Sequence, residues 1–204
     1  MAVQLDVEER RRSAILAAAG TLIAERGYHA VRIADIARLV GTSTGAVHYY
    51  FPGKNDVLTA ALRHALEQAF QRQRVELVQI EDAHQRLLRL IDMQLPTVGQ
   101  GRDEWSVWLQ FWAEAAIHPE LRPVHNEFYD RWRDAVSRTV RRGQHQGVFC
   151  RNLDVDWVTL RLTALTDGAG IQVLTGAAGM TVTVMRELLV DFVERELLPT
   201  RATR

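Results

Sequence analysis

The chain has 204 residues, of which 47% are hydrophobic and 25% are charged, and its 25 basic side chains balance 25 acidic ones. This composition is typical of a globular protein and excludes a chain dominated by disorder. No run approaches the roughly 20 apolar residues of a membrane span, the first residues lack the pattern of a secretory leader, and a single cysteine excludes an intramolecular disulfide. We therefore expect a cytoplasmic protein that contacts no membrane.

The N-terminal quarter of the chain predicts short helices separated by glycine. An amphipathic helix fits Val7 to Arg26, and Gly27 follows it in the usual C-terminal position. Its apolar positions share one face: Ile15, Leu16, Ala19, Leu22 and Ile23. Shorter helices fit Ile33–Leu39 and Ser43–Tyr50, with Gly41 in the turn between them.

Longer helical patterns follow the break at Pro52-Gly53. They fit roughly residues 55–80, 82–95, 104–117, 120–145, 154–175 and 180–197. No segment shows the sustained alternation of β-branched residues that a strand requires, so we predict no sheet. The sequence therefore predicts an all-α fold of about nine helices, with a three-helix head in residues 1–54 and a helical domain in residues 55–204.

The strongest functional pattern lies in the two short helices. Two such helices joined by the tripeptide Val40-Gly41-Thr42 form a helix-turn-helix, whose second helix can enter the major groove of DNA. Thr42 or Ser43 is the expected N-cap of that second helix. The small core beneath the motif would be formed by Ile36, Ala37, Val47 and Phe51.

This region closely resembles the TetR family of one-component repressors. The resemblance rests on Gly27-Tyr28, Asp35-Ile36-Ala37, Gly41-x-Ser43-x-Gly45 and Tyr49-Tyr50-Phe51-Pro52-x-Lys54. It covers about the first 60 residues, and the rest of the chain agrees with the family only in length, helicity and general layout.

The resemblance implies that the helix beginning at Ser43 lies in the major groove. The residues implied to contact bases are Thr44, Gly45, Ala46 and His48, and those implied to hold phosphates are Tyr49, Tyr50 and Lys54. Hydroxyl, phenol and ammonium groups near a helix N-terminus suit phosphate oxygens, which agrees with this assignment. The chain departs from many relatives at Thr44, where they have a basic residue, and at Arg32, where they have a hydroxyl-bearing cap. The methyl group of Ala46 is therefore a candidate for contact with a thymine methyl.

Three tryptophans in the middle of the chain form the main candidate for an effector site. Trp105, Trp108 and Trp112 follow helical i, i+3, i+7 spacing, so the indoles share a face. Such a face can wall an apolar cavity or present π-faces to a cation, and the family resemblance also places an effector pocket among these helices. Further aromatic residues on the next helix could face it: Phe128, Tyr129 and Trp132. Core packing is the alternative for any single tryptophan.

Two acidic residues are candidates for an anionic contact to the effector, Glu114 and Asp167. Asp167 is preferred because it lies within an apolar helical pattern, where a buried charge needs a partner. His118 and His125 lack the spacing of a metal-ligand pair, and no catalytic or phosphate-binding motif is present. We therefore predict no metal, no cofactor and no enzymatic activity.

The last two helical patterns are rich in small residues, including Ala164, Gly168, Ala169 and Gly170. A glycine inside a helix costs about 1 kcal/mol relative to alanine, which favours close approach of another helix or a ligand. Packing within one chain is one explanation. The other is a homodimer through these helices, which would also place two recognition helices one DNA turn apart.

Together these patterns predict a DNA-binding transcriptional regulator, a repressor released from double-stranded operator DNA by a small-molecule effector. The alternative is a helical small-molecule binding protein or enzyme with a vestigial head. Activation instead of repression is a further alternative.

Overall fold

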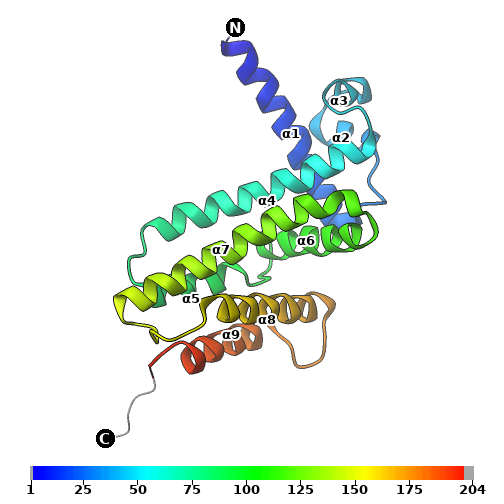
Figure 1. Ribbon diagram of the computed structural model, residues 1–204. Coiled ribbons are helices and arrows are strands. Elements are labelled where there is room, and N and C mark those ends of the chain that lie inside the picture. The colour runs from blue at the N-terminus through cyan, green and yellow to red at the C-terminus, as the bar shows by residue number, and fades with distance from the viewer. Residues whose placement is uncertain (1, 200–204) are drawn as a thin grey trace, which may run out of the picture. The chain divides into compact units, whose positions relative to one another are not determined.

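The computed structural model describes residues 2–199, with side chains from residue 7 onward. Within that range the backbone forms nine α-helices and one 3-10 turn and contains no strand, which confirms the predicted all-α class (Figure 1). The elements are α1 (Ala2–Arg26), α2 (Ile33–Val40), α3 (Thr44–Tyr50), α4 (Lys54–Val78), α5 (Ala83–Met93), α6 (Gln100–Ile117), η1 (Pro119–Leu121), α7 (Arg122–Gln146), α8 (Val155–Thr175) and α9 (Val182–Glu196). None of the helices in the described range is long and apolar enough to cross a membrane.

The described residues divide into two compact units. The head unit contains the chain up to Phe70 together with Ser106–Leu121, and the C-terminal unit contains Gln71–Trp105 and the described residues from Arg122 onward. Helices α4 and α6 each contribute residues to both units. The predicted domain boundary between residues 54 and 55 stays a prediction.

A small apolar core joins α1, α2 and α3 within the head unit. The four core residues predicted for the helix-turn-helix, Ile36, Ala37, Val47 and Phe51, are at most 3% exposed. The five apolar positions predicted along α1 are at most 4% exposed. Burial of these side chains is what holds the short helices α2 and α3, since isolated helices of 8 and 7 residues are not stable in water.

The turn between α2 and α3 has the geometry that the sequence predicts. Gly41 adopts the left-handed conformation with φ of 72°, and the N–H of Thr42 donates to the carbonyl of Ala37 at 2.9 Å. Ser43 is the N-cap of α3, because its hydroxyl accepts a hydrogen bond from the N–H of Ala46 at 3.1 Å. The two helices are thereby fixed at both sides of the turn.

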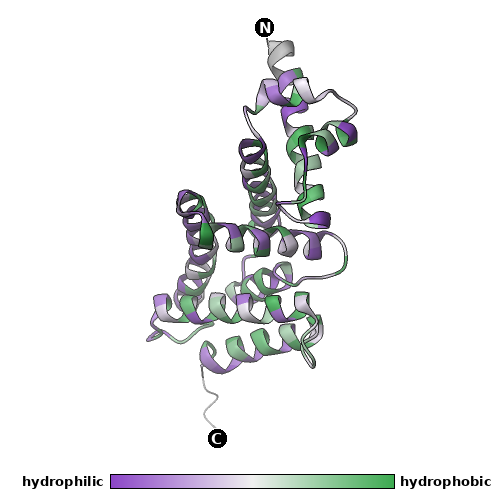
Figure 2. Ribbon diagram, turned by 90° about the vertical axis from the view of Figure 1, so that its right-hand side faces the viewer, coloured by the Kyte–Doolittle hydropathy of each residue, from purple (hydrophilic) through white to green (hydrophobic). Residues whose placement is uncertain are grey.

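The C-terminal unit is built from helices packed through small and aromatic residues. α7 packs against α5 and α8, and α8 packs against α9. Hydrophobic residues recur along α8 and α9 (Figure 2), and α9 buries Met185, Leu189 and Val193 at intervals of four residues. A Cβ atom at Gly143 would lie 1.9 Å from the ring of Phe149, so only glycine permits this ring to pack on α7.

Helix α6 begins earlier than the sequence predicts, at Gln100 instead of residue 104. The glycines in this segment indicate a loop, yet Gly101 lies inside the first helical turn. A Cβ atom there would lie 2.8 Å from the carbonyl oxygen of Leu95. The preceding loop supplies acceptors for the first turn, since the N–H of Arg102 donates to the carbonyl of Thr97 at 2.8 Å. Gly101 is therefore a close-approach glycine and not a helix breaker.

Candidate functional site

The residues predicted to meet DNA lie along the outer side of α3. Thr44, Gly45, His48 and Tyr49 are exposed, whereas Val47 faces the core. Tyr49 is 75% exposed although it is aromatic, and its ring meets that of Tyr50 edge-on, with 5.1 Å between centroids. Ala46 and Tyr50 are half-buried. A short helix that exposes hydroxyl, imidazole and phenol groups can donate hydrogen bonds to phosphates and base edges.

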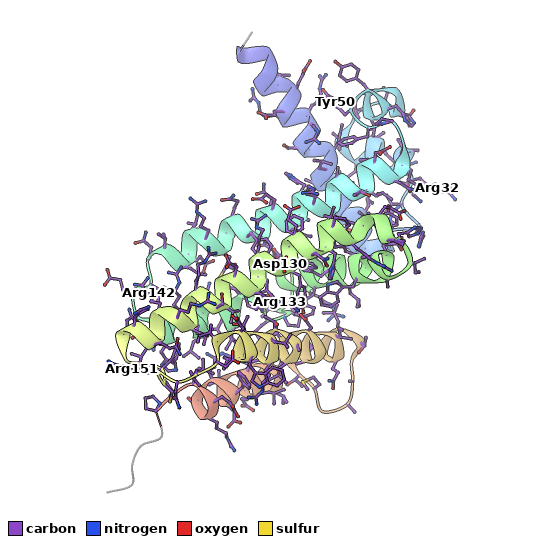
Figure 3. All side chains as sticks on the ribbon, in the orientation of Figure 1. Arg32, Tyr50, Asp130, Arg133, Arg142 and Arg151 are labelled. Carbon is purple, nitrogen blue, oxygen red and sulfur yellow. The ribbon has the colours of Figure 1, made fainter. Side chains whose placement is uncertain are left out.

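Arg32, one of the departures from the family pattern, stands immediately before α2. Its side chain is exposed and extends away from the helices of the head unit (Figure 3). It makes no side-chain capping hydrogen bond to α2, so the first turn lacks the hydroxyl cap of many relatives. The carboxylate of Asp35 lies in that turn, where its negative charge interacts favourably with the positive end of the helix dipole.

Lys54 has a partner that the sequence does not predict. Its ammonium group donates a hydrogen bond to the backbone carbonyl of His29 at 2.8 Å. The start of α4 is thereby tied to the turn between α1 and α2. The contact between Lys54 and DNA phosphate stays a prediction.

Helix α6 holds the same turn through two side chains. The amide of Gln110 donates to the carbonyl of Ile23 at 2.7 Å and accepts from the N–H of Tyr28, so it bridges the C-terminal end of α1. Glu114, considered above as an effector ligand, is only 5% exposed, and its carboxylate lies 2.8 Å from the imidazole of His29. The carboxylate of Glu114 is therefore already engaged within the head unit.

The predicted effector residues divide between the two units. Trp108 and Trp112 belong to the head unit, where their ring centroids are 6.0 Å apart. The others belong to the C-terminal unit: Trp105, Phe128, Trp132 and Asp167. Their contacts with an effector stay predictions.

Trp105, Phe128 and Trp132 are all less than 8% exposed. The indole N–H of Trp105 donates to the carbonyl of Gln94 at 2.7 Å, and its ring fills the space above Gly170, where a Cβ atom would lie 2.0 Å from the ring. Gly170 thus has a packing role within one chain.

A polar cluster on α7 and α8 surrounds Asp167. The phenol of Tyr129 donates a hydrogen bond to the carboxylate of Asp167. The guanidinium carbon of Arg133 lies 4.5 Å from the centroid of the Tyr129 ring, and the imidazole of His125 stacks on that ring at 5.5 Å. We call these four residues the Tyr129 cluster. The sequence predicts Tyr129 as an aromatic residue that faces the tryptophans and predicts no role for Arg133, although His125, Tyr129 and Arg133 follow one another at intervals of four residues.

Burial governs the ionisation of the Tyr129 cluster. It raises the pKa of Asp167 from 3.8 to about 6, against the lowering effects of the Tyr129 hydrogen bond and of the charge on Arg133. Burial also raises the pKa of Tyr129, and its hydrogen bond to Asp167 adds to that effect. A carboxylate held in this environment is poorly solvated and gains free energy from a further cationic partner.

His118 and His125, whose spacing is not that of a metal-ligand pair, belong to different units. His118 lies 3.8 Å from the carboxylate of Glu114 in the head unit, whereas His125 lies in the C-terminal unit. No group of three histidine, cysteine, aspartate or glutamate side chains converges as metal ligands anywhere in residues 7–199.

Comparison with known protein families gives two matches that together span most of the chain. Residues 15–61 match the family described as bacterial regulatory proteins, tetR family. Residues 83–198 match the C-terminal region of the BetI-type transcriptional repressors. The two matches coincide with the helix-turn-helix and with the helices that carry the Tyr129 cluster.

Individual relatives agree with these families. The chain is 29% identical to the transcriptional regulator BetI of Brucella abortus over 119 residues, which is 58% of this chain and 60% of that protein. It is 25% identical to BetI 1 of Chromohalobacter salexigens over 197 residues, 95% of this chain and 94% of that protein. The match to the Brucella protein thus spans about three fifths of that relative's length.

Solved structures extend the likeness over nearly the whole chain. A transcriptional regulator from Saccharomonospora viridis, solved in complex with choline, is 52% identical, with a TM-score of 0.88 over 94% of this chain and 99% of that chain. A TetR-family regulator from Rhodococcus sp. is 26% identical, with a TM-score of 0.78 over 91% of this chain and 97% of that chain. From the family matches and these relatives, the chain belongs to the TetR family of bacterial regulatory proteins, with a C-terminal region of the BetI type.

Proposed function

We propose that this protein is a transcriptional repressor that binds operator DNA through α3 and is released by a quaternary ammonium effector of the choline class. The observation that carries the proposal is the choline complex of the regulator that is 52% identical over 94% of this chain. In this proposal the protein is a regulator and not an enzyme, and it works where bacterial operator DNA lies, in the cytoplasm.

The outer side of α3 supports the DNA-binding part of the proposal. Its side chains contribute exposed donors, while Val47 fixes the opposite side in the core. Ala46 and Gly45 leave room for close approach to base edges, and Tyr49 and Tyr50 can donate to phosphates from the end of the helix. We assign base contacts to Thr44, Gly45, Ala46 and His48, and phosphate contacts to Tyr49, Tyr50 and Lys54.

The Tyr129 cluster supports the effector part of the proposal. A quaternary ammonium group carries a positive charge and no hydrogen-bond donor, so proteins bind it through aromatic faces and nearby carboxylates. Tyr129 and Asp167 offer one of each, in hydrogen-bond contact on neighbouring helices. We therefore assign the cationic group of the effector to these two residues.

Exposed apolar residues on the last two helices support a homodimer. Trp157 is 55% exposed and Leu160 is 42% exposed on α8, and Leu188 is 37% exposed on α9. On the exposed side of α8, a Cβ atom at Gly168 would find nothing within 4 Å, so no packing among the described residues accounts for that glycine. A second copy on this surface would cover the apolar residues and supply the second recognition helix that a two-fold operator requires.

Two binding measurements test the proposal. Footprinting of DNA that flanks the protein's own gene is expected to show protection of a near-palindrome, and calorimetry is expected to show binding of choline to the free protein. Absence of any specific protection would contradict the regulator, whereas specific DNA binding without choline binding would contradict only the effector class. Ala46→Trp is the matched variant for the first measurement, because a bulky indole on the outer side of α3 should block entry into the groove.

A further inference from the structure

Arg133 occupies a position in the Tyr129 cluster that is suited to an organic cation. Its guanidinium carbon lies 4.5 Å from the centroid of the Tyr129 ring, within the distance of a cation–π contact. His125, one helical turn before Tyr129, stacks on the same ring with an angle of 17° between the planes. The phenol is thus flanked along α7 by His125 and Arg133, which is labelled in Figure 3.

The guanidinium of Arg133 is not fully satisfied where it lies. Its Nε atom is buried and has no hydrogen-bond partner within the described part of the chain. A buried donor of a charged group that lacks an acceptor destabilises the arrangement, because it has lost water without replacement. Arg133 is therefore held by the Tyr129 ring and by the charge of Asp167, at the expense of its own solvation.

We propose that Arg133 is an internal competitor of the effector: it covers the ring of Tyr129 in the ligand-free protein and leaves when a quaternary ammonium group binds there. This inference rests on the proposed function. The guanidinium of Arg133 and a trimethylammonium group would both bind the face of the Tyr129 ring, and both would be attracted to the carboxylate of Asp167. Two cations held against the same ring repel each other. One must leave for the other to bind.

The exchange fits the chemistry of the remaining contacts. Because trimethylammonium has no N–H, it does not compete for the carboxylate lone pairs, and the hydrogen bond from Tyr129 to Asp167 can persist. Because one cation replaces another, Asp167 has a positive neighbour both before and after the effector binds. The displaced guanidinium gains the solvation that its buried Nε lacks.

The test compares two arginine variants of the full chain by calorimetry with choline chloride. The measurement is made at pH 8, where the pKa of Asp167, about 6, leaves the carboxylate ionised. Arg133→Gln is expected to bind choline about 3- to 30-fold more tightly than the parent, since a competing cation–π contact is removed. Arg131→Gln is the matched control: it removes the same charge from the same helix, but its guanidinium lies over Phe128, and we expect its affinity to stay within about twofold. Unchanged or weaker binding to Arg133→Gln would overturn the inference.

A neutral analogue of choline shows whether Arg133→Gln acts by removing a competing cation or by enlarging the site. In 3,3-dimethyl-1-butanol a carbon atom replaces the quaternary nitrogen, so it has the shape of choline without its charge. Its affinity should change by less than about twofold between the parent and Arg133→Gln. An equal gain for both ligands would show that the substitution merely opens room, which contradicts competition between cations.

A crystal structure of the parent protein with choline gives the result without any variant. Arg133 is expected to have left the ring of Tyr129, and a guanidinium still on that ring beside bound choline would overturn the inference. If the parent binds no choline, both the effector class and this inference fall. If it binds choline while Arg133→Gln binds no better, the effector class stands and only the inference fails.

Discussion

At the scale of single residues, Asp167 is a buried carboxylate whose ionisation is unfavourable, and it is one of the two residues to which we assign the cationic group of the effector. Its pKa is raised from 3.8 to about 6, so the folded chain binds this proton more tightly than the unfolded chain does. The proton on Asp167 makes its full contribution to the free energy of unfolding below about pH 4, and this contribution is lost as the pH rises through about 6. Above that pH the ionised group destabilises the ligand-free fold by up to about 3 kcal/mol.

Asp167→Asn is therefore expected to stabilise the protein and to impair effector binding at the same time. An asparagine oxygen can still accept the hydrogen bond from Tyr129, but it carries no charge. Denaturant unfolding at pH 8 should show a higher unfolding free energy than the parent, and choline binding should be strongly weakened. Asp130→Asn, on the exposed side of α7, is the control and should change neither quantity. Lower stability of Asp167→Asn at pH 8 would contradict the raised pKa.

The same pKa predicts how choline binding depends on pH. Protonation of Asp167 removes the charge that faces the ammonium group, so affinity should fall by up to about tenfold for each pH unit below about 6. Calorimetry from pH 5 to pH 8 measures this dependence. Asp167→Asn should show a flat profile, and a parent protein with a flat profile would place the cation elsewhere.

Lys54 has two possible roles, and the salt dependence of DNA binding separates them. Its ammonium group donates a hydrogen bond to the carbonyl of His29. If it also neutralises a phosphate, Lys54→Gln should lower the slope of log K against log salt by about 1 and weaken binding to all DNA sequences equally. Lys54→Arg keeps the charge and should keep the slope. A lowered melting temperature with an unchanged slope would assign Lys54 to the head unit's structure alone.

Lys54 and Asp167 also show which features of the site can be predicted from the sequence and which cannot. The TetR motif consists of residues that lie close together in the sequence, so it is enough to identify Lys54 and the outer residues of α3 as candidates for DNA contact. The partner of Lys54 lies 25 positions away in the chain, and Tyr129 and Asp167 are 38 apart. No periodicity encodes such pairs, since the packing of whole helices decides them. Even so, the apolar surroundings of Asp167 were enough to single it out as a charge in need of a partner.

At the scale of helices, glycine is the residue whose role the sequence left open. Gly170 on α8 permits the Trp105 ring to pack, because a Cβ atom there would lie 2.0 Å from it. Gly20 on α1 is also inside a helix, but a Cβ atom there would find nothing within 4 Å. The same substitution should therefore have opposite effects at the two sites.

Gly170→Ala is expected to destabilise the protein by about 1–3 kcal/mol, because the indole must move from a packed position. Gly20→Ala should stabilise it by about 0.5–1 kcal/mol through helix propensity. Urea unfolding curves of the two variants measure both effects. A Gly170→Ala protein as stable as Gly20→Ala would show that the Trp105 ring adjusts freely.

Helix positions were largely predictable, since spacing of apolar residues and capping residues determine them locally. The predicted helix Ser43–Tyr50 differs from α3 only in that Ser43 is its N-cap. The predicted start of α6 at residue 104 is wrong, because a glycine such as Gly101 usually indicates the end of a helix. In the structure Gly101 lies inside α6, where the carbonyl oxygen of Leu95 leaves no room for a larger residue. The tryptophans of α6 were correctly placed on one helix, yet their spacing did not reveal that they divide between two units.

At the scale of the whole molecule, the proposed repressor needs two copies to read a two-fold operator. Leu188→Glu introduces a charge on the exposed apolar surface of α9, where burial against a second copy would be costly. Analytical ultracentrifugation should then show a species of 23.2 kDa, half the mass of the parent, with much weaker operator binding. Val98→Glu is the control, because Val98 is 99% exposed and lies outside α8 and α9. A dimeric Leu188→Glu protein would place the interface elsewhere.

In the proposed mechanism, effector binding and operator binding oppose each other within one protein. An effector can weaken DNA binding only if it binds the DNA-free protein more tightly than the DNA-bound protein. The coupling free energy between two such sites is typically about 1–3 kcal/mol. The direct measurement is a titration of choline into a preformed complex with a fluorescent operator, followed by anisotropy. We expect saturating choline to weaken operator binding about 5- to 150-fold, and operator DNA to weaken choline binding by the same factor. Operator affinity that stays constant at choline concentrations known to saturate the free protein would contradict it.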